Sequence, residues 1–187
     1  MSEEFYRTDL KENAIDDLEK LSTFLELASR DKSYWKWVII ALHSSLYKFM
    51  LLALKNPDCS GIWEKVKKKK VGLIYKIDLF NPKNKLISFL KAFQWLQKTE
   101  KMSGYVNSEA FVSTSEINEA MKRLNTELRN QFFHFKPQGW SIEIRLIEEI
   151  IQKTLPIIKF IIFKSGRVLI EENEKLVIDR ILKEIIS

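Results

Sequence analysis

The stretch from about Lys32 to Lys55 most constrains the fold, because it is apolar on nearly all sides of a helical wheel. A helix of this kind has to be covered by other elements all around, so we expect it in the middle of a helical bundle. Its most apolar part, residues 37–54, is interrupted by polar side chains such as His43 and Lys48. These interruptions favour a buried core helix over a membrane span.

Apolar residues recur at helical spacing along most of the remaining chain. Only five glycines and four prolines occur in 187 residues, which also favours long regular elements. We therefore expect an all-α, up-and-down bundle of about five to six helices. The other predicted helices cover approximately residues 9–29, 84–98, 113–135, 141–164 and 172–186. The first of these begins at a capping box, Asp9 followed by Glu12, and Pro156 lies within the helix at 141–164 and should kink it.

The length of the chain favours a single domain over residues 1–187, in which residues 165–187 form a C-terminal helical extension. The acidic N-terminus is followed by no apolar signal region, and Cys59 has no second cysteine with which to form a disulfide. A cytoplasmic protein without membrane contact is expected. The sequence contains neither a CxxC nor an HxxxH spacing, so we expect no metal and no cofactor.

A weaker pattern separates the second and third predicted helices. Residues 62–66 are interpreted as a short helix, and residues 71–77 are too short to classify. A basic run lies between them and consists of Lys67, Lys68, Lys69 and Lys70. This run is either a solvated face or a contact to an RNA backbone, with Trp63 and Tyr75 as rings on which bases can stack. The net charge of +6 mildly favours a polyanionic partner.

The predicted helix at residues 113–135 begins with a capping box, Ser113 followed by Glu116, and ends before Pro137 and Gly139. One apolar stripe of this helix should face the core, and it consists of Ile117, Met121, Leu124, Leu128, Phe132 and Phe135.

Four other residues of this helix, namely Arg129, Asn130, Phe133 and His134, lie off the apolar stripe. A large apolar ring among polar groups needs a cover of its own. A second copy of the chain is one candidate for that cover.

Arg129 and His134, separated by four residues, with Asn130 directly after the arginine, resemble the R-x4-6-H motif of the HEPN superfamily. The resemblance implies a small α-helical protein and a metal-independent RNase of a toxin–antitoxin or antiphage defence system. It also implies a composite site where the motif helices of a homodimer meet, and an antitoxin or defence partner protein. Lys136 occupies the place of a tyrosine that is modified in one subset of the family, so that mode of control is not expected.

RNA cleavage without a metal needs a base for the 2′-hydroxyl, an acid for the leaving 5′-oxygen and a cation for the phosphorane. Arg129 is suited to the cation and His134 to the acid or base, while Asn130 can orient the phosphate. Lys136 is a further candidate for substrate binding. The alternative interpretation is structural: Arg129 caps carbonyls or pairs with a carboxylate, and His134 only ends the helix.

His43 allows two interpretations. The simpler one is a hydrogen-bonded core histidine. The other places its ring in a pocket shared with Arg129 and His134. For the whole chain, the alternative to an endoribonuclease is a non-catalytic HEPN-like module that binds RNA or nucleotides or serves as an adaptor.

Overall fold

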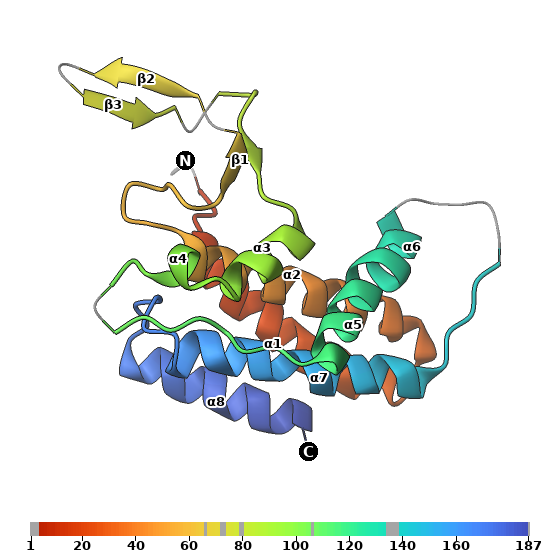
Figure 1. Ribbon diagram of the computed structural model, residues 1–187. Helices are drawn as coiled ribbons and strands as arrows, with labels where there is room; N and C mark the ends of the chain where they lie inside the picture. Colours follow the sequence, from red (N-terminus) through yellow and green to blue (C-terminus); the bar gives the residue numbers. More distant parts are fainter. Residues whose placement is uncertain are drawn as a thin grey trace.

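The computed structural model describes residues 4–65, 67–71, 74–78, 81–105, 107–133 and 139–186. This part of the chain is mostly helical, which confirms the all-α expectation at a coarse level. The long helices pack into one body, from which a small β-hairpin projects (Figure 1).

The long apolar stretch forms the centre of the body, as expected. It begins with one 3-10 turn, η1 (Lys32–Tyr34), and continues as α2 (Trp35–Leu54). The elements that pack most extensively against α2 are α1 (Leu10–Ala28), α3 (Phe89–Leu96), the π-helix η2 (Leu124–Arg129) and α7 (Ile144–Phe163).

By length and composition alone, residues Lys32–Leu54 could span a membrane, but 67% of their most apolar window is buried inside the structure. Burial of this kind is what a core helix requires.

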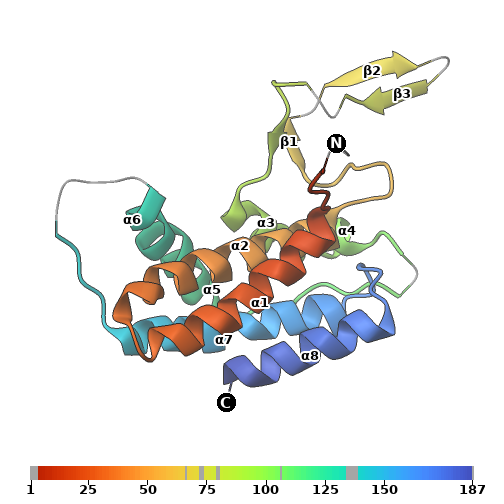
Figure 2. The ribbon, with the colours of Figure 1, turned by 180° about the vertical axis from the view of Figure 1, so that it is seen from behind.

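The two outer helices α1 and α8 (Glu172–Ile186) have the bounds that the sequence predicts to within one or two residues. Asp9 caps α1 through the N–H of Glu12, and the Glu12 carboxylate accepts from the N–H of Asp9, so the predicted capping box is present. Helix α8 packs against α1 and α7 and buries Ile178 and Leu182 (Figure 2). The expected C-terminal extension therefore covers part of the bundle.

Four short strands were missed by the sequence analysis. The short helix expected at residues 62–66 is wrong, because Trp63–Lys65 forms strand β1 and pairs antiparallel with β4 (Lys85–Leu86). The same pairing explains why α3 begins at Phe89 and not at Asn84. Ser88 caps α3. Strands β2 (Lys68–Val71) and β3 (Ile74–Ile77) form the projecting hairpin, in register Lys68↔Ile77 to Val71↔Ile74.

The helices after α3 also begin later than expected. A single turn, α4 (Thr99–Met102), precedes α5 (Ser115–Arg123), which is capped by Thr114 and not by Ser113. The Thr114 hydroxyl accepts from the N–H of Ile117, while Glu116 forms an ion pair with Lys153 of α7 and not the expected capping box. Helix α7 begins at Ile144 and not at Ser141, and Pro156 lies within it as expected.

Arg167, in the connection between α7 and α8, is a buried cation with 4% of its surface exposed. Its Nε donates to the carbonyl oxygen of Ala53 at 2.8 Å, and its Nη2 donates to Oδ1 of Asn56 at 3.0 Å. The guanidinium therefore satisfies a carbonyl in the last turn of α2. A Cβ atom at Gly104 would lie 1.4 Å from Nη1 of Arg167, so this glycine leaves the space that the guanidinium fills.

Candidate functional site

The motif helix, which is the helix predicted at residues 113–135 that contains Arg129 and His134, includes a π-helical turn. The sequence analysis did not predict this turn. Residues Leu124–Arg129 form η2 between α5 and α6 (Asn130–Phe133). Short π-helical turns within α-helices occur frequently at functional sites. The turn keeps the predicted core residues in the core, because Met121, Leu124 and Leu128 are fully or almost fully buried.

Arg129 and Asn130 are the two predicted site residues that the structure brings together. Nη1 of Arg129 donates to Oδ1 of Asn130 at 3.1 Å, and both residues are partly buried. Phe132 is partly buried against the core, as its place on the predicted stripe requires. His134, Phe135 and Lys136 lie outside the described residues, as does the side chain of Phe133.

His43 lies on the face of α2 that packs against η2. Its Nε2 is 3.1 Å from Oδ1 of Asn125, so the Nε2–H tautomer donates to this oxygen. Its ring stacks on Phe89, with 4.2 Å between the ring centroids and 17° between the ring planes. His43 is therefore a hydrogen-bonded core histidine, as the simpler interpretation has it.

The second interpretation of His43, a pocket shared with Arg129 and His134, stays a prediction, although Arg129 acts on His43 electrostatically. Burial lowers the pKa of His43 to about 4, a smaller opposing effect comes from the hydrogen bond to Asn125, and the positive charge of Arg129 lowers the pKa further. His43 is therefore neutral at pH 7. It holds Asn125, and with it the π-helical turn, and does not itself titrate near neutrality.

Asn125 is the residue of this cluster that the sequence analysis missed. It lies one turn before Arg129 on η2, and its partner His43 is 82 residues away in the sequence. An asparagine inside an amphipathic helix was the available signal, since such a residue usually needs a hydrogen-bond partner.

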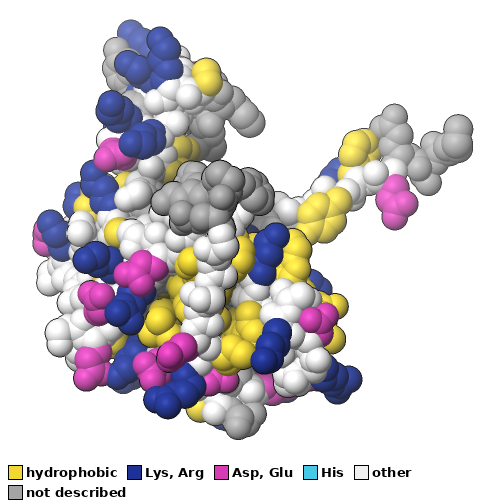
Figure 3. Space-filling model, turned by 90° about the vertical axis from the view of Figure 1, so that its right-hand side faces the viewer, with side chains coloured by type: hydrophobic (Ala, Val, Ile, Leu, Met, Phe, Trp, Pro, Cys, Tyr) yellow, Lys and Arg dark blue, Asp and Glu magenta, His cyan; other side chains and the backbone are white. Residues whose placement is uncertain are grey.

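The lysine run does not lie next to Arg129. It is carried by the projecting hairpin, whereas η2 and α6 lie on another side of the body (Figures 1 and 2). The side chains of Lys67, Lys68 and Lys70 are exposed and form no ion pair with another described residue, whereas the side chain of Lys69 is outside the description. Lysine and arginine side chains gather at this end of the molecule (Figure 3).

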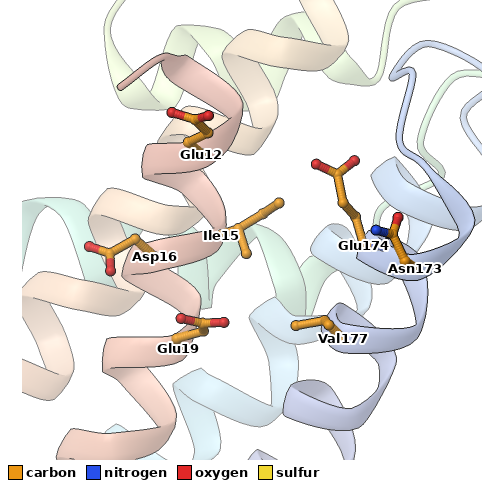
Figure 4. Close-up of a pocket in the computed structure, with 7 residues that line it drawn as sticks. All are labelled: Glu12, Ile15, Asp16, Glu19, Asn173, Glu174 and Val177. Carbon is orange, nitrogen blue, oxygen red and sulfur yellow. Dashed lines mark hydrogen bonds between the residues drawn. The ribbon is translucent and has the colours of Figure 1, made fainter. Parts of the chain in front are cut away.

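Negatively charged side chains line a pocket of about 330 Å³ between α1 and α8 (Figure 4). Its acidic lining consists of Glu12, Asp16, Glu19 and Glu174. Glu174 is paired with Lys11, with 2.6 Å between Oε1 and Nζ. Among the described residues no group of three or more His, Cys, Asp or Glu side chains is placed to hold a metal ion. The acidic pocket is unfavourable for a polyanion, in contrast to the hairpin.

No family model matches this sequence, and searches among curated proteins and solved structures found no match. The function therefore has to be inferred from the residues of this chain.

Proposed function

We propose that this protein is a metal-independent endoribonuclease with a HEPN-like bundle, acting in a toxin–antitoxin or antiphage defence system. The observation that carries the proposal is the hydrogen-bonded Arg129–Asn130 pair, which lies where the π-helical turn meets α6 and is followed by His134 in the sequence. The charge of Arg129 acts on neutral His43. The planar guanidinium group of an arginine is suited to binding two oxygens of a phosphate.

In this mechanism Arg129 stabilises the charge that develops on the phosphorane, and Asn130 fixes the orientation of the guanidinium. His134 transfers protons to or from the RNA oxygens, because an imidazole can serve as an acid or as a base in proton transfer. Attack of the 2′-oxygen forms a bond to phosphorus and breaks the bond to the 5′-oxygen. The products are a 2′,3′-cyclic phosphate and a 5′-hydroxyl end.

One Arg–His pair supplies a single titrating group, whereas the reaction needs both an acid and a base. We propose that the active unit is a homodimer in which the motif helices face each other, so that two pairs meet at a two-fold axis. An antitoxin or other defence protein is the proposed regulatory partner.

Wild-type protein is expected to cleave RNA in an excess of EDTA, because the reacting groups all belong to the protein and the RNA. Purified protein is incubated with a labelled RNA, and the product ends are identified by mass spectrometry. Loss of all cleavage in EDTA, with recovery on addition of a divalent ion, contradicts the mechanism. Binding of RNA without cleavage under any condition favours the alternative, a non-catalytic RNA- or nucleotide-binding module.

The basic hairpin is expected to bind the RNA backbone without reading bases. Each phosphate contact contributes about 0.7 to the slope of log affinity against log salt for single strands. Replacing Lys67, Lys68, Lys69 and Lys70 by glutamine should therefore weaken RNA binding and reduce this slope, by up to about 3 if all four contact phosphates. The measurement is a salt titration by fluorescence anisotropy.

A matched control replaces four other exposed lysines by glutamine and leaves both the hairpin and the candidate site intact: Lys20, Lys159, Lys164 and Lys183. An unchanged slope in the hairpin variant would show that its lysines are only a solvated face.

A further inference from the structure

A pocket of about 400 Å³ lies beside the motif helix, between α6, the start of α2 and the segment that leads into α7. Three aromatic side chains line it: Trp35, Phe132 and Trp140. Phe132 and Trp140 meet edge to face, with 5.4 Å between their ring centroids and 89° between the ring planes. A pocket of this size and aromatic content is typical of a site for a flat organic ring.

Trp35 supplies an observation that packing alone does not explain. Its indole Nε1–H is buried and has no hydrogen-bond partner among the described residues. A buried donor without an acceptor lowers stability, so such groups in native proteins usually need an explanation, for example a bound ligand. Trp35 lines the pocket, and rotation of its ring toward the cavity would bring this donor to a carbonyl oxygen or a ring nitrogen of a ligand.

The charged groups that line the pocket are Lys32 and Lys36, and no carboxylate is among its described lining residues. Lys32 is exposed, and Nζ of Lys36 lies 4.9 Å above the ring of Trp37. A nucleotide combines a flat ring, hydrogen-bond acceptors and a negative charge, so its chemistry matches this lining. Exposed hydrophobic side chains also gather, among charged side chains of both signs, on the face that Figure 3 turns toward the viewer.

The pocket adjoins the candidate site through two elements. Phe132 follows Arg129 by three residues, which is about one helical turn. Ile39, which also lines the pocket, precedes His43 by four residues on α2, a rise of about 6 Å. A ligand in the pocket is therefore close to the cluster around Arg129.

We infer that this pocket binds an unstacked base of single-stranded RNA, next to the phosphate that Arg129 holds. That the bound polymer is RNA rests on the proposed function. That the pocket holds a base rests on the size and lining of the pocket itself. Phe132 and Trp140 provide the stacking surface, Trp35 donates to the base, and Lys32 with Lys36 neutralises the flanking phosphate. The pocket thereby positions the strand at the site.

The test measures binding of a fluorescent 2′-O-methyl RNA oligonucleotide, which cannot be cleaved by 2′-oxygen attack. Trp140→Ala is expected to weaken binding roughly 5- to 100-fold, because base stacking on an aromatic ring is lost. Trp35→Phe keeps a ring but removes the donor, and should weaken binding roughly 3- to 10-fold. Phe163→Ala is the control, since Phe163 is as exposed as Trp140 (40% and 39%) but lies at the other end of α7.

Adenosine monophosphate serves as the second probe. Affinity equal to that of the oligonucleotide identifies the natural occupant as a free nucleotide, and much weaker binding identifies it as RNA. Unchanged affinity of Trp140→Ala and Trp35→Phe for both probes, with folding verified by circular dichroism, overturns the inference. So does a result in which Trp140→Ala changes only the oligomeric state in sedimentation, because the pocket is then a protein contact.

Failure of this inference differs from failure of the proposed function. If the tryptophan variants bind both probes normally while wild-type protein cuts RNA in EDTA, the proposed RNase activity is supported and the proposed base pocket is rejected. If the variants lose binding while wild-type protein cuts no RNA, the base pocket stands in a non-catalytic protein.

Discussion

Arg129→Ala is expected to reduce RNA cleavage by roughly 100- to 1,000-fold, the loss found when one donor to a developing oxyanion is removed. The physical reason is that Arg129, the cation hydrogen-bonded to Asn130, is the group proposed to stabilise the phosphorane charge. Arg129→Lys keeps the charge but loses the planar fork, so it should recover only part of the activity. Initial rates on a labelled RNA under single-turnover conditions separate this effect from changes in binding.

Arg180→Ala is the matched control, because it removes the same charge from a side chain that is 69% exposed on α8. It should leave the cleavage rate unchanged. Equal rates for Arg129→Ala and wild-type protein would exclude Arg129 from the chemistry. Equal losses in both variants would indicate a general charge effect.

Mixing the inactive variants tests whether the site is shared between two chains. If Arg129 of one chain works with His134 of its partner, a heterodimer of Arg129→Ala and His134→Ala chains retains one intact pair. If one intact pair is sufficient, a random mixture should then recover up to about a quarter of the wild-type rate. No recovery, although native mass spectrometry shows heterodimers, would mean either that the pair works within one chain or that both pairs are required. A strictly monomeric protein would exclude the composite site.

Acidification is expected to destabilise the protein through His43, by about 2 kcal/mol between about pH 7.5 and about pH 5. In the folded protein the pKa of His43 is lowered to about 4 from the ordinary 6.5. Between these two values the unfolded chain binds a proton that the folded chain does not bind. Stability is therefore complete above about pH 6.5 and is progressively lost as the pH falls toward 4.

The measurement is urea unfolding across this pH range for wild-type protein and for His43→Gln, whose amide can still donate to Asn125. The variant should lack the acid-dependent loss of stability. His43 and His134 are the two histidines of the chain, so NMR titration of the imidazole protons provides an independent test. An imidazole of the folded protein assigned to His43 that titrates near pH 6.5 would contradict the prediction.

Local signals in the sequence, namely capping residues and the spacing of apolar residues, were sufficient to predict several of the helices. The capping box at Asp9 located α1, and the all-round apolar character of α2 located the centre of the bundle. Strands β1 and β4 escaped notice because their stability depends on pairing between segments that lie about twenty residues apart. Neither strand is long enough to show the alternation of apolar and polar residues by which a strand is recognised in a sequence.

The candidate site was predictable in part for a similar reason. Arg129 and Asn130 are neighbours in the sequence, and their contact in the structure follows from that proximity. The contact between His43 and Asn125 joins two helices, and it depends on the π-helical turn, which adds a residue to one turn of the helix. A wheel drawn at 100° per residue does not account for that extra residue.

The fit between Gly104 and Arg167 has a consequence for how this protein can vary in evolution. A side chain at position 104 would occupy the place of the guanidinium, while a shorter residue at position 167 would leave a void and free the carbonyl of Ala53. Either change alone is harmful, whereas the two together can compensate for each other. In a set of homologous sequences, positions 104 and 167 should therefore co-vary: glycine at the first wherever arginine occupies the second, and larger residues at the first only where the arginine has been lost.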